Sequence, residues 1–466
     1  MATESSGQIE KIEDIGTDSS AVVTRWLREI ELADAHEKDW RKRANKVIAR
    51  YRDERSQNDD NVRFNILYSN VEVLKSVIYA KPPIPDVRRR FLDRDPVGKQ
   101  ASQLLDRALS YSIECADLDT VLKQVVEDVL LPGRGVAKVR YAPTFDDDGQ
   151  VAYEEAKVDY VEWDMFRMSP AKRWEKVRWV AFGDLLTRAD LKKQFREKGE
   201  RCKLDWCPDG IEDNADNEIF KRALVWTIWD KATRKVFAVC RGFPDSPLAE
   251  VADPLRLEDF FPCPRPVYAV STNGNMIPVP EYTQYQDQAT ELDNITARID
   301  TLVDALRRRG VYDATFPELD KLARAGDNEF IPVENYANLA EKGGIEKAIM
   351  ELPIDNIAKV LVNLYGQREQ VKQTIYEITG ISDIVRGSTS PSETLGAQQL
   401  KSQYSNIRTS PRQTALQQFA RDIMRLQAEI ISEHFSPMTL QMMSGMQIAP
   451  EVLQLLKNDK IGRAHV

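Results

Sequence analysis

Two long stretches in the second half of the chain repeat apolar residues at intervals of three and four, which is typical of one face of a helix. The second stretch, 353–380, begins near Asp355, a good N-cap residue, and ends at Gly380. The first stretch, 281–310, carries acidic residues opposite its apolar face. Its apolar or near-apolar positions are Tyr285, Ala289, Leu292, Thr296, Ile299, Val303 and Leu306, and its acidic positions are Asp287, Glu291, Asp293, Asp300 and Asp304. By periodicity alone, both are surface helices on an ordinary core.

The segment between these two helices, 311–352, mixes short patterns. We expect a short helix over 316–326, a strand over 329–335 and a turn at the glycine pair 343–344. Three consecutive cations precede the segment: Arg307, Arg308 and Arg309. Cations stabilise a helix C-terminus through the macrodipole, so capping is the simpler interpretation of this triplet, and phosphate contact is the alternative.

A polar loop and a third helix follow. Ser390 and Glu393 form a capping box with Pro391 at the first helical position, so a helix is expected to begin here. Pro411 lacks a backbone donor and should kink or restart that helix, with a second capping box as one way to restart it at Ser410.

The N-terminal part of the chain is expected to form helices first and β-hairpins later. Residues 1–19 are polar and predicted to be disordered. A Pro-rich stretch, 261–280, links this part to the first long helix. The predicted fold class is therefore α+β and rich in helix. Helices are expected over 20–55, 62–80, 95–117 and 119–131, and hairpin turns at 146–149 and 230–233.

Composition limits the function classes. The chain has 466 residues and a net charge of −9, whereas a general nucleic-acid binder is usually basic. The charge argues against tight wrapping of DNA but not against a DNA conduit. No run approaches the ~18 apolar residues of a transmembrane helix, and the N-terminus lacks the features of a secretory signal. Five cysteines without a pairing pattern indicate a reducing compartment.

Motifs for catalysis are missing from the sequence. Cys202 and Cys207 are the only close cysteine pair, and no histidine accompanies them, so we expect neither a metal site nor a cofactor. The sequence contains no P-loop, nucleophile elbow or zinc-protease motif. Gly133-Arg134-Gly135 indicates a turn rather than a phosphate site. The histidines are too scattered for a triad: His36, His434 and His465.

The order of long helix, small insert, long helix, polar loop and kinked helix resembles the core of tailed-bacteriophage portal proteins, in particular the podovirus-like ones. Residues 161–195 are similar to the wing segment of that family, 260–299 to the entry into its stem, and 390–408 to its tunnel helix. The resemblance covers most of 20–458 and rests on the order of several segments, since no single motif is diagnostic.

The resemblance implies an organisation into named regions. They are a wing domain at 20–280, stem helices at 281–310 and 353–380, a clip at 311–352, a tunnel loop with a kinked helix at 381–434, and the start of a crown at 435–460. It also implies a ring of about twelve copies at one capsid vertex of the virion. Such a ring conducts double-stranded DNA and docks terminase and tail adaptor proteins, with capsid and scaffolding proteins as further partners and no membrane. Catalysis is not expected, because the ATPase of that system is a separate terminase subunit.

Candidate sites follow from this assignment. The tunnel loop would approach DNA with Arg386, Ser388, Thr389 and Ser390. The triplet Arg307–Arg309 would contact DNA phosphates. The clip would present a docking surface made of Glu318, Lys321, Arg324, Glu329 and Glu334.

Two further points limit the functional interpretation: the nature of the last six residues and the function classes that stay open. The last six residues, Ile461–Val466, match the translation of a widely used sequencing adapter, so we expect that the natural reading frame was cut near Lys460 and continued into adapter; a genuine short tail is the alternative. Two other classes stay open: a cytoplasmic helical scaffold without a DNA channel, and a nucleic-acid enzyme with dispersed acidic residues.

Overall fold

The computed structural model describes nine ranges of the chain, and its contacts divide the chain into two compact units. The first unit comprises 1–54, 67–284 and 383–466, and the second 55–66 and 285–382. Helices combine with antiparallel sheets, so the fold is α+β, as the sequence predicts. The described ranges are 19–55, 62–88, 95–146, 148–208, 219–305, 310–312, 349–351, 355–381 and 395–458.

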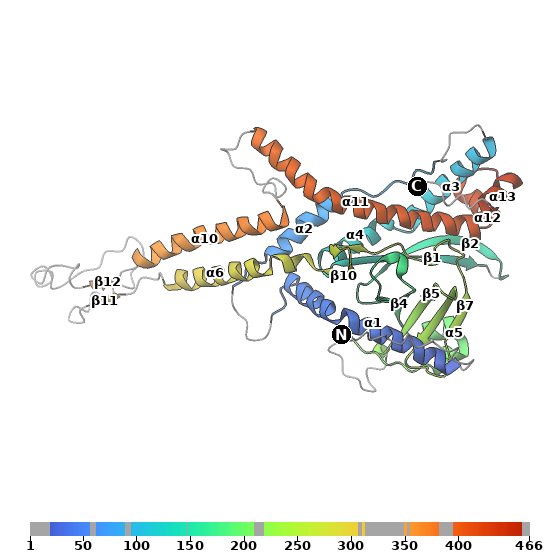
Figure 1. Cartoon of the computed structure of the whole chain (residues 1–466), viewed down its shortest axis with the longest axis horizontal. Coiled ribbons are helices and arrows are strands. Elements are labelled where there is room, and N and C mark those ends of the chain that lie inside the picture. Colours follow the sequence, from blue (N-terminus) through green and yellow to red (C-terminus); the bar gives the residue numbers. More distant parts are fainter. Residues whose placement is uncertain are drawn as a thin grey trace, which may run out of the picture. The chain divides into compact units, whose positions relative to one another are not determined.

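A five-stranded antiparallel sheet in the first unit is covered on one face by the helix α1 (Ser19–Tyr51) (Figure 1). The helix buries eight residues at regular intervals of three and four, as the sequence pattern predicts for nearly all of them. They are Val23, Trp26, Ile30, Ala33, Glu37, Trp40, Ala44 and Val47. The strands, in sheet order, are β3 (Phe166–Met168), β4 (Trp179–Leu186), β5 (Ala223–Asp230), β6 (Lys235–Cys240) and β7 (Ala249–Ala252).

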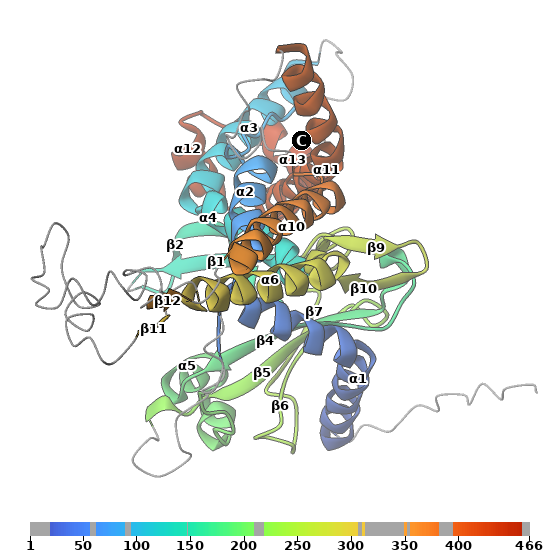
Figure 2. The same cartoon turned by 90° about the vertical axis from the view of Figure 1, so that its left-hand side faces the viewer.

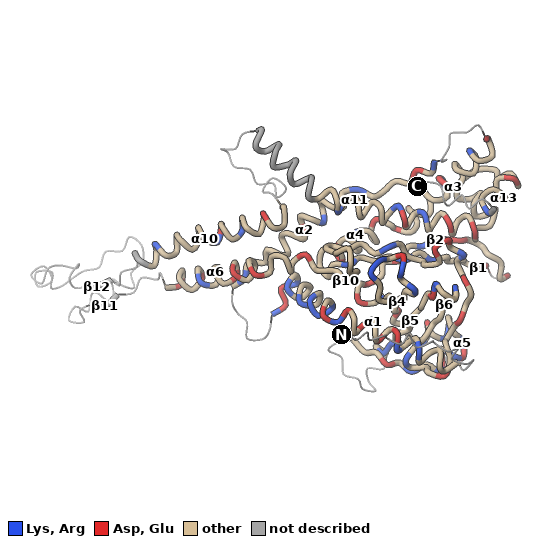
Figure 3. The backbone as a smooth tube through the Cα atoms, in the orientation of Figure 1, with Lys and Arg blue, Asp and Glu red and all other residues tan. Residues whose placement is uncertain are grey.

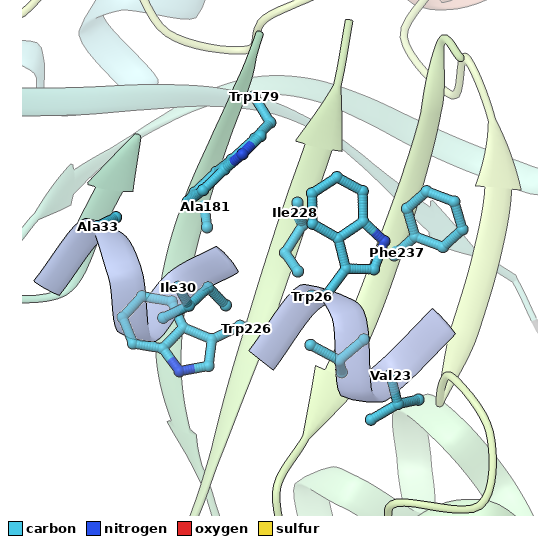
Figure 4. Close-up of a cluster of buried hydrophobic side chains, with 10 residues drawn as sticks. Val23, Trp26, Ile30, Ala33, Trp179, Ala181, Trp226, Ile228 and Phe237 are labelled. Carbon is cyan, nitrogen blue, oxygen red and sulfur yellow. The ribbon is translucent and has the colours of Figure 1, made fainter. Parts of the chain in front are cut away.

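The contact between α1 and this sheet is an aromatic core (Figure 4). Trp26 packs edge-on against Trp179 of β4, with ring centroids 6.1 Å apart, and against Phe237 of β6 at 5.6 Å. Trp226 and Ile228 enter the same core because alternate residues of β5 point to one face. Burial of each large apolar side chain stabilises the fold by about 1.5–3 kcal/mol.

The opposite face of the same sheet carries a second core under α5 (Arg188–Arg201). This helix begins with a capping box in which Thr187 and Asp190 bond to each other's backbone. Its Leu191 is fully buried against Val225 of β5 and Cys240 of β6. A short 3-10 helix, η1 (Trp174–Lys176), lies between β3 and β4 in the chain.

A three-stranded antiparallel sheet forms the other sheet of this unit. The first two strands are the predicted hairpin, and Gly149 in its turn has φ +76°, a conformation that glycine adopts readily. Gly135 faces α4, where an added Cβ would stand 2.5 Å from the carbonyl oxygen of Val125. The elements are β1 (Arg134–Phe145), β2 (Val151–Val161), β8 (Val267–Tyr268) and α4 (Leu118–Leu130).

Helices of the first unit gather around this sheet (Figure 2). The helix α3 starts where the sequence predicts, because Asp95 caps it by accepting bonds from the amides of Val97 and Gly98. The helix α11 continues through Pro411, so the prediction that Ser410 opens a new capping box is wrong. The helices are α2 (Ile66–Ile78), α3 (Pro96–Cys115), α11 (Leu395–His434), α12 (Pro437–Ser444) and α13 (Pro450–Asn458).

The Pro-rich stretch expected to be a simple link contains strands as well. Its hairpin is followed at once by a 3-10 helix, so the chain stays ordered up to Gln284. The elements after β8 are β9 (Val270–Thr272), β10 (Asn275–Val279) and η3 (Glu281–Gln284).

The second unit is built on two long helices and a short ladder. Both helices form where apolar periodicity predicts them, and Gly380 has φ +73° just after the second one ends. The elements are α6 (Gln286–Ala305), β11 (Gly310–Tyr312), β12 (Ile349–Glu351) and α10 (Asp355–Thr379).

Candidate functional site

The site residues predicted from the family resemblance fall outside the described residues. The structure therefore gives no account of the tunnel loop, the arginine triplet or the clip surface. The residues concerned are Arg307, Arg308, Arg309, Glu318, Lys321, Arg324, Glu329, Glu334, Arg386, Ser388, Thr389, Ser390 and Glu393, together with the termini 1–18 and 459–466.

The helix pair α6–α10 is the described part of the predicted stem. Leu292 of α6 and Leu364 and Ile375 of α10 are buried in this unit. Beyond the end of α6 the chain enters β11, and β12 returns antiparallel to it, pairing Gly310 with Glu351. The two helices therefore run antiparallel, closed at one end by this ladder.

Charges are distributed unequally over the two helices (Figure 3). The sequence of α6 contains five acidic residues and one basic residue. That of α10 contains three of each sign. An acidic helix does not hold a DNA backbone, because binding to phosphates depends on Lys and Arg releasing counterions.

One of the acidic positions has a local structural role that the sequence pattern missed. The carboxylate of Asp293 accepts a hydrogen bond from the backbone N–H of Phe64 at 3.0 Å. Phe64 also lies under the ammonium group of Lys372 on α10, 5.9 Å from the ring centroid. The segment 62–65 is thus not helical, and the expectation that α2 begins near Val62 is wrong.

Several apolar side chains of this unit face solvent. Val303, predicted to lie on the buried face of α6, is instead 47% exposed. On α10, Val362 is 70% exposed, and helical geometry sets it roughly opposite the buried Leu364. The exposed set on α10 is Val360, Val362, Tyr365 and Ile378.

A buried charge network in the first unit joins α1 to the start of β1. The guanidinium of Arg134, fully buried, donates to both carboxylate oxygens of Glu37 at 2.5 and 3.2 Å. Arg41 donates to the same carboxylate at 2.8 Å. The prediction of a turn at Gly133-Arg134-Gly135 is therefore wrong for its last two residues, which belong to β1.

The network continues to the edge strand β3. Arg167 pairs with Asp34 at 2.5 Å, so three guanidinium groups meet two carboxylates in this region. Burial opposes ionisation of Glu37, but the guanidinium groups of Arg134 and Arg41 outweigh it and lower the pKa of the carboxyl. Burial and Arg167 lower the pKa of Arg41 to about 10, so it stays charged at neutral pH. The network carries a net positive charge.

Next to this network lies a polar cavity of about 340 Å³, which no sequence motif indicates. It is formed by the segment 172–175, the loop and strand 265–268, and the hairpin 271–276. Tyr268 of β8 stands opposite Arg134 in the β1–β8 register and lines the cavity. Lys and Arg positions gather on loops near β10 in Figure 3.

The structure also pairs cysteines that the sequence keeps apart. The sulfur of Cys202 lies 3.4 Å from that of Cys240, and both are buried under α5. In the sequence, Cys202 lies close to Cys207 only, so spacing did not indicate the contact with Cys240. Among the described residues, no group of three or more His, Cys, Asp and Glu side chains is placed to hold a metal ion.

No helix in the described ranges has the length and apolar character needed to cross a membrane. In the comparisons with known proteins, no family model matches the chain and no curated sequence is similar to it.

Proposed function

We propose that this chain is one subunit of a portal ring, the channel at a capsid vertex through which double-stranded DNA enters and leaves a phage head. The observation that carries the proposal is the antiparallel pair α6–α10 with its closing ladder. The sequence resemblance predicts two stem helices around an inserted clip, and 36 residues, 313–348, lie between the two strands of the ladder.

Exposed apolar residues support self-assembly. The α10 residues Val360 and Val362 and the α6 residue Val303 would remain in water in an isolated subunit. Such side chains would be covered where a neighbouring copy packs against this helix pair. A closed ring buries such a surface through heterologous contacts, in which two different faces of neighbouring copies meet.

An apolar cavity in the first unit offers a second surface of the same kind. Its volume is about 540 Å³, and it lies between the end of α2, α4 and α11. Ile84 at its edge is 88% exposed. We propose that a second copy of this chain packs against this cavity in the ring, because a ring subunit needs complementary surfaces on both sides.

The acidic character of α6 supports a conduit rather than a DNA-binding surface. Five acidic residues against one basic residue on this helix repel a phosphate backbone. A wall of this kind allows a duplex to slide, whereas a wall of Lys and Arg would retain it. The partners of the proposed ring are DNA, terminase, tail adaptors, and capsid and scaffolding proteins, and its place is the virion.

Electron microscopy of the purified chain tests the proposal. We expect closed rings with a central hole wider than a DNA duplex. Val362→Asp should lower the yield of rings, because it places a charge in the proposed interface. Asn363→Asp adds the same charge at a neighbouring exposed polar position and should leave ring yield close to that of the parent protein. Small open oligomers or monomers at every concentration would rule the proposal out.

A further inference from the structure

The polar cavity beside β8 has an excess of positive charge on its lining. Lys172, Arg173 and Arg265 line it, and Glu175 is its one carboxylate. Among the described residues, none of the three cations forms an ion pair or a side-chain hydrogen bond. By contrast, Arg134 and Arg41 nearby both form ion pairs with the carboxylate of Glu37.

Neutral donors and an aromatic ring complete the lining. The hairpin contributes the hydroxyls of Ser271 and Thr272 and the amides of Asn273 and Asn275. The ring of Trp174 borders the cavity and packs against Phe261, with centroids 5.7 Å apart. At about 340 Å³ the cavity falls within the range of about 300–1,000 Å³ typical of small-molecule sites.

We propose that this cavity binds the phosphate group of an organic phosphate, with Lys172, Arg173 and Arg265 as its cationic contacts. A phosphate carries close to two negative charges at neutral pH and offers three acceptor oxygens, which match the lining's net charge and its donors. The planar guanidinium of Arg265 can bind two of those oxygens at once. The indole of Trp174 provides a surface against which an attached planar ring can stack.

The proposal does not depend on ring assembly, because every residue in it belongs to one subunit. The proposed source of the phosphate is a free mononucleotide, and a DNA strand is the other source that the test must separate from it. Calorimetric titration of the full chain separates these sources with three probes: inorganic phosphate, deoxyadenosine monophosphate and a short DNA duplex. We expect the mononucleotide to bind more tightly than inorganic phosphate. Binding of the duplex alone, or of no probe at millimolar concentration, would overturn the proposal.

One variant and one control make the test specific. Arg265→Ala should weaken mononucleotide binding by about tenfold or more, since it removes a charged hydrogen bond. Lys235→Ala removes an exposed cation that is already paired with Glu250, and it should leave the affinity unchanged. Equal losses in both variants would show a general charge effect and refute the site.

Discussion

Arg134, at the start of β1, is bound through two hydrogen bonds to the carboxylate of Glu37, which lies 97 positions earlier on α1. The guanidinium also stacks over the ring of Trp40, 4.3 Å from its centroid, and donates to the carbonyl of Phe166. This pair therefore connects α1 to both sheets of the first unit.

Glu37→Ala should destabilise the protein by about 3–5 kcal/mol, because it leaves the charge of Arg134 buried without its partner. Urea unfolding of the variant measures the loss. The matched control is Arg140→Ala, which breaks the partly exposed pair of Arg140 and Asp159 at 2.6 Å. That change should cost less than about 1 kcal/mol. Similar losses in the two variants would contradict the role assigned to the buried pair.

Asp128 of α4 makes a pH-dependent contribution to the free energy of unfolding. Burial raises the pKa of this carboxyl to about 7, although the hydroxyl of Tyr160 donates to it at 2.6 Å. The folded state then binds a proton that the unfolded state releases near pH 4. Its contribution to stability is fully present below that pH and is lost as pH rises through about 7.

Asp128→Asn removes this titration while keeping an oxygen that accepts from Tyr160. Above pH 7 the variant should be more stable than the parent, by up to about 4 kcal/mol. Thermal unfolding measured between pH 4 and 8 should show the parent losing stability relative to the variant as pH rises. A constant difference across that range would show that Asp128 does not titrate there.

Gly135 permits the close approach of β1 and α4. Alanine at this position would place its Cβ 2.5 Å from the carbonyl oxygen of Val125 and 2.7 Å from one of its methyl groups. Since backbone must move to relieve this contact, Gly135→Ala should cost about 1–3 kcal/mol in denaturant unfolding. Gly274→Ala is the control, because nothing lies within 4 Å of its added Cβ. An equally large effect at both glycines would count against a steric cause.

Cys202 and Cys240 are expected to form a disulfide when the protein is treated with diamide. The hydrogen bond between the two thiols lowers the pKa of Cys202, so Cys202 is the thiol that more readily becomes the nucleophilic thiolate. The two thiols lose two hydrogens, which the diazene reagent accepts to become a hydrazine. Peptide mass spectrometry identifies the linked pair, and Cys240→Ser should abolish it. A link between Cys202 and Cys207 instead would contradict the geometry.

Local chemistry predicted much of the secondary structure. The Asp95 cap followed by Pro96 marks the start of α3, and the stretch from Asp355 to Gly380 matches α10 closely. These features follow from near neighbours in the chain, because caps and hairpin turns involve bonds over a few residues. The predicted contacts of the tunnel loop and clip remain predictions, since those residues are not described.

The burial of Glu37 was not expected from the sequence. The other buried positions in the three-and-four repeat of α1 are all apolar, and that pattern was the available signal of a buried acid. The sequence could not show that Arg134 would form an ion pair with Glu37. The same limit applies to Phe64, whose amide donates a hydrogen bond to Asp293, 229 positions later in the chain.

Periodicity and turn chemistry thus determined which elements form, while only the tertiary structure decided which charges are paired and which remain available. Periodicity reports which side of an element is apolar, but the free energy of a charge depends on the groups that the fold brings around it. The cysteine pair under α5 and the cationic cavity beside Tyr268 are assembled from segments far apart in the chain. For this reason neither had a signature in the linear sequence.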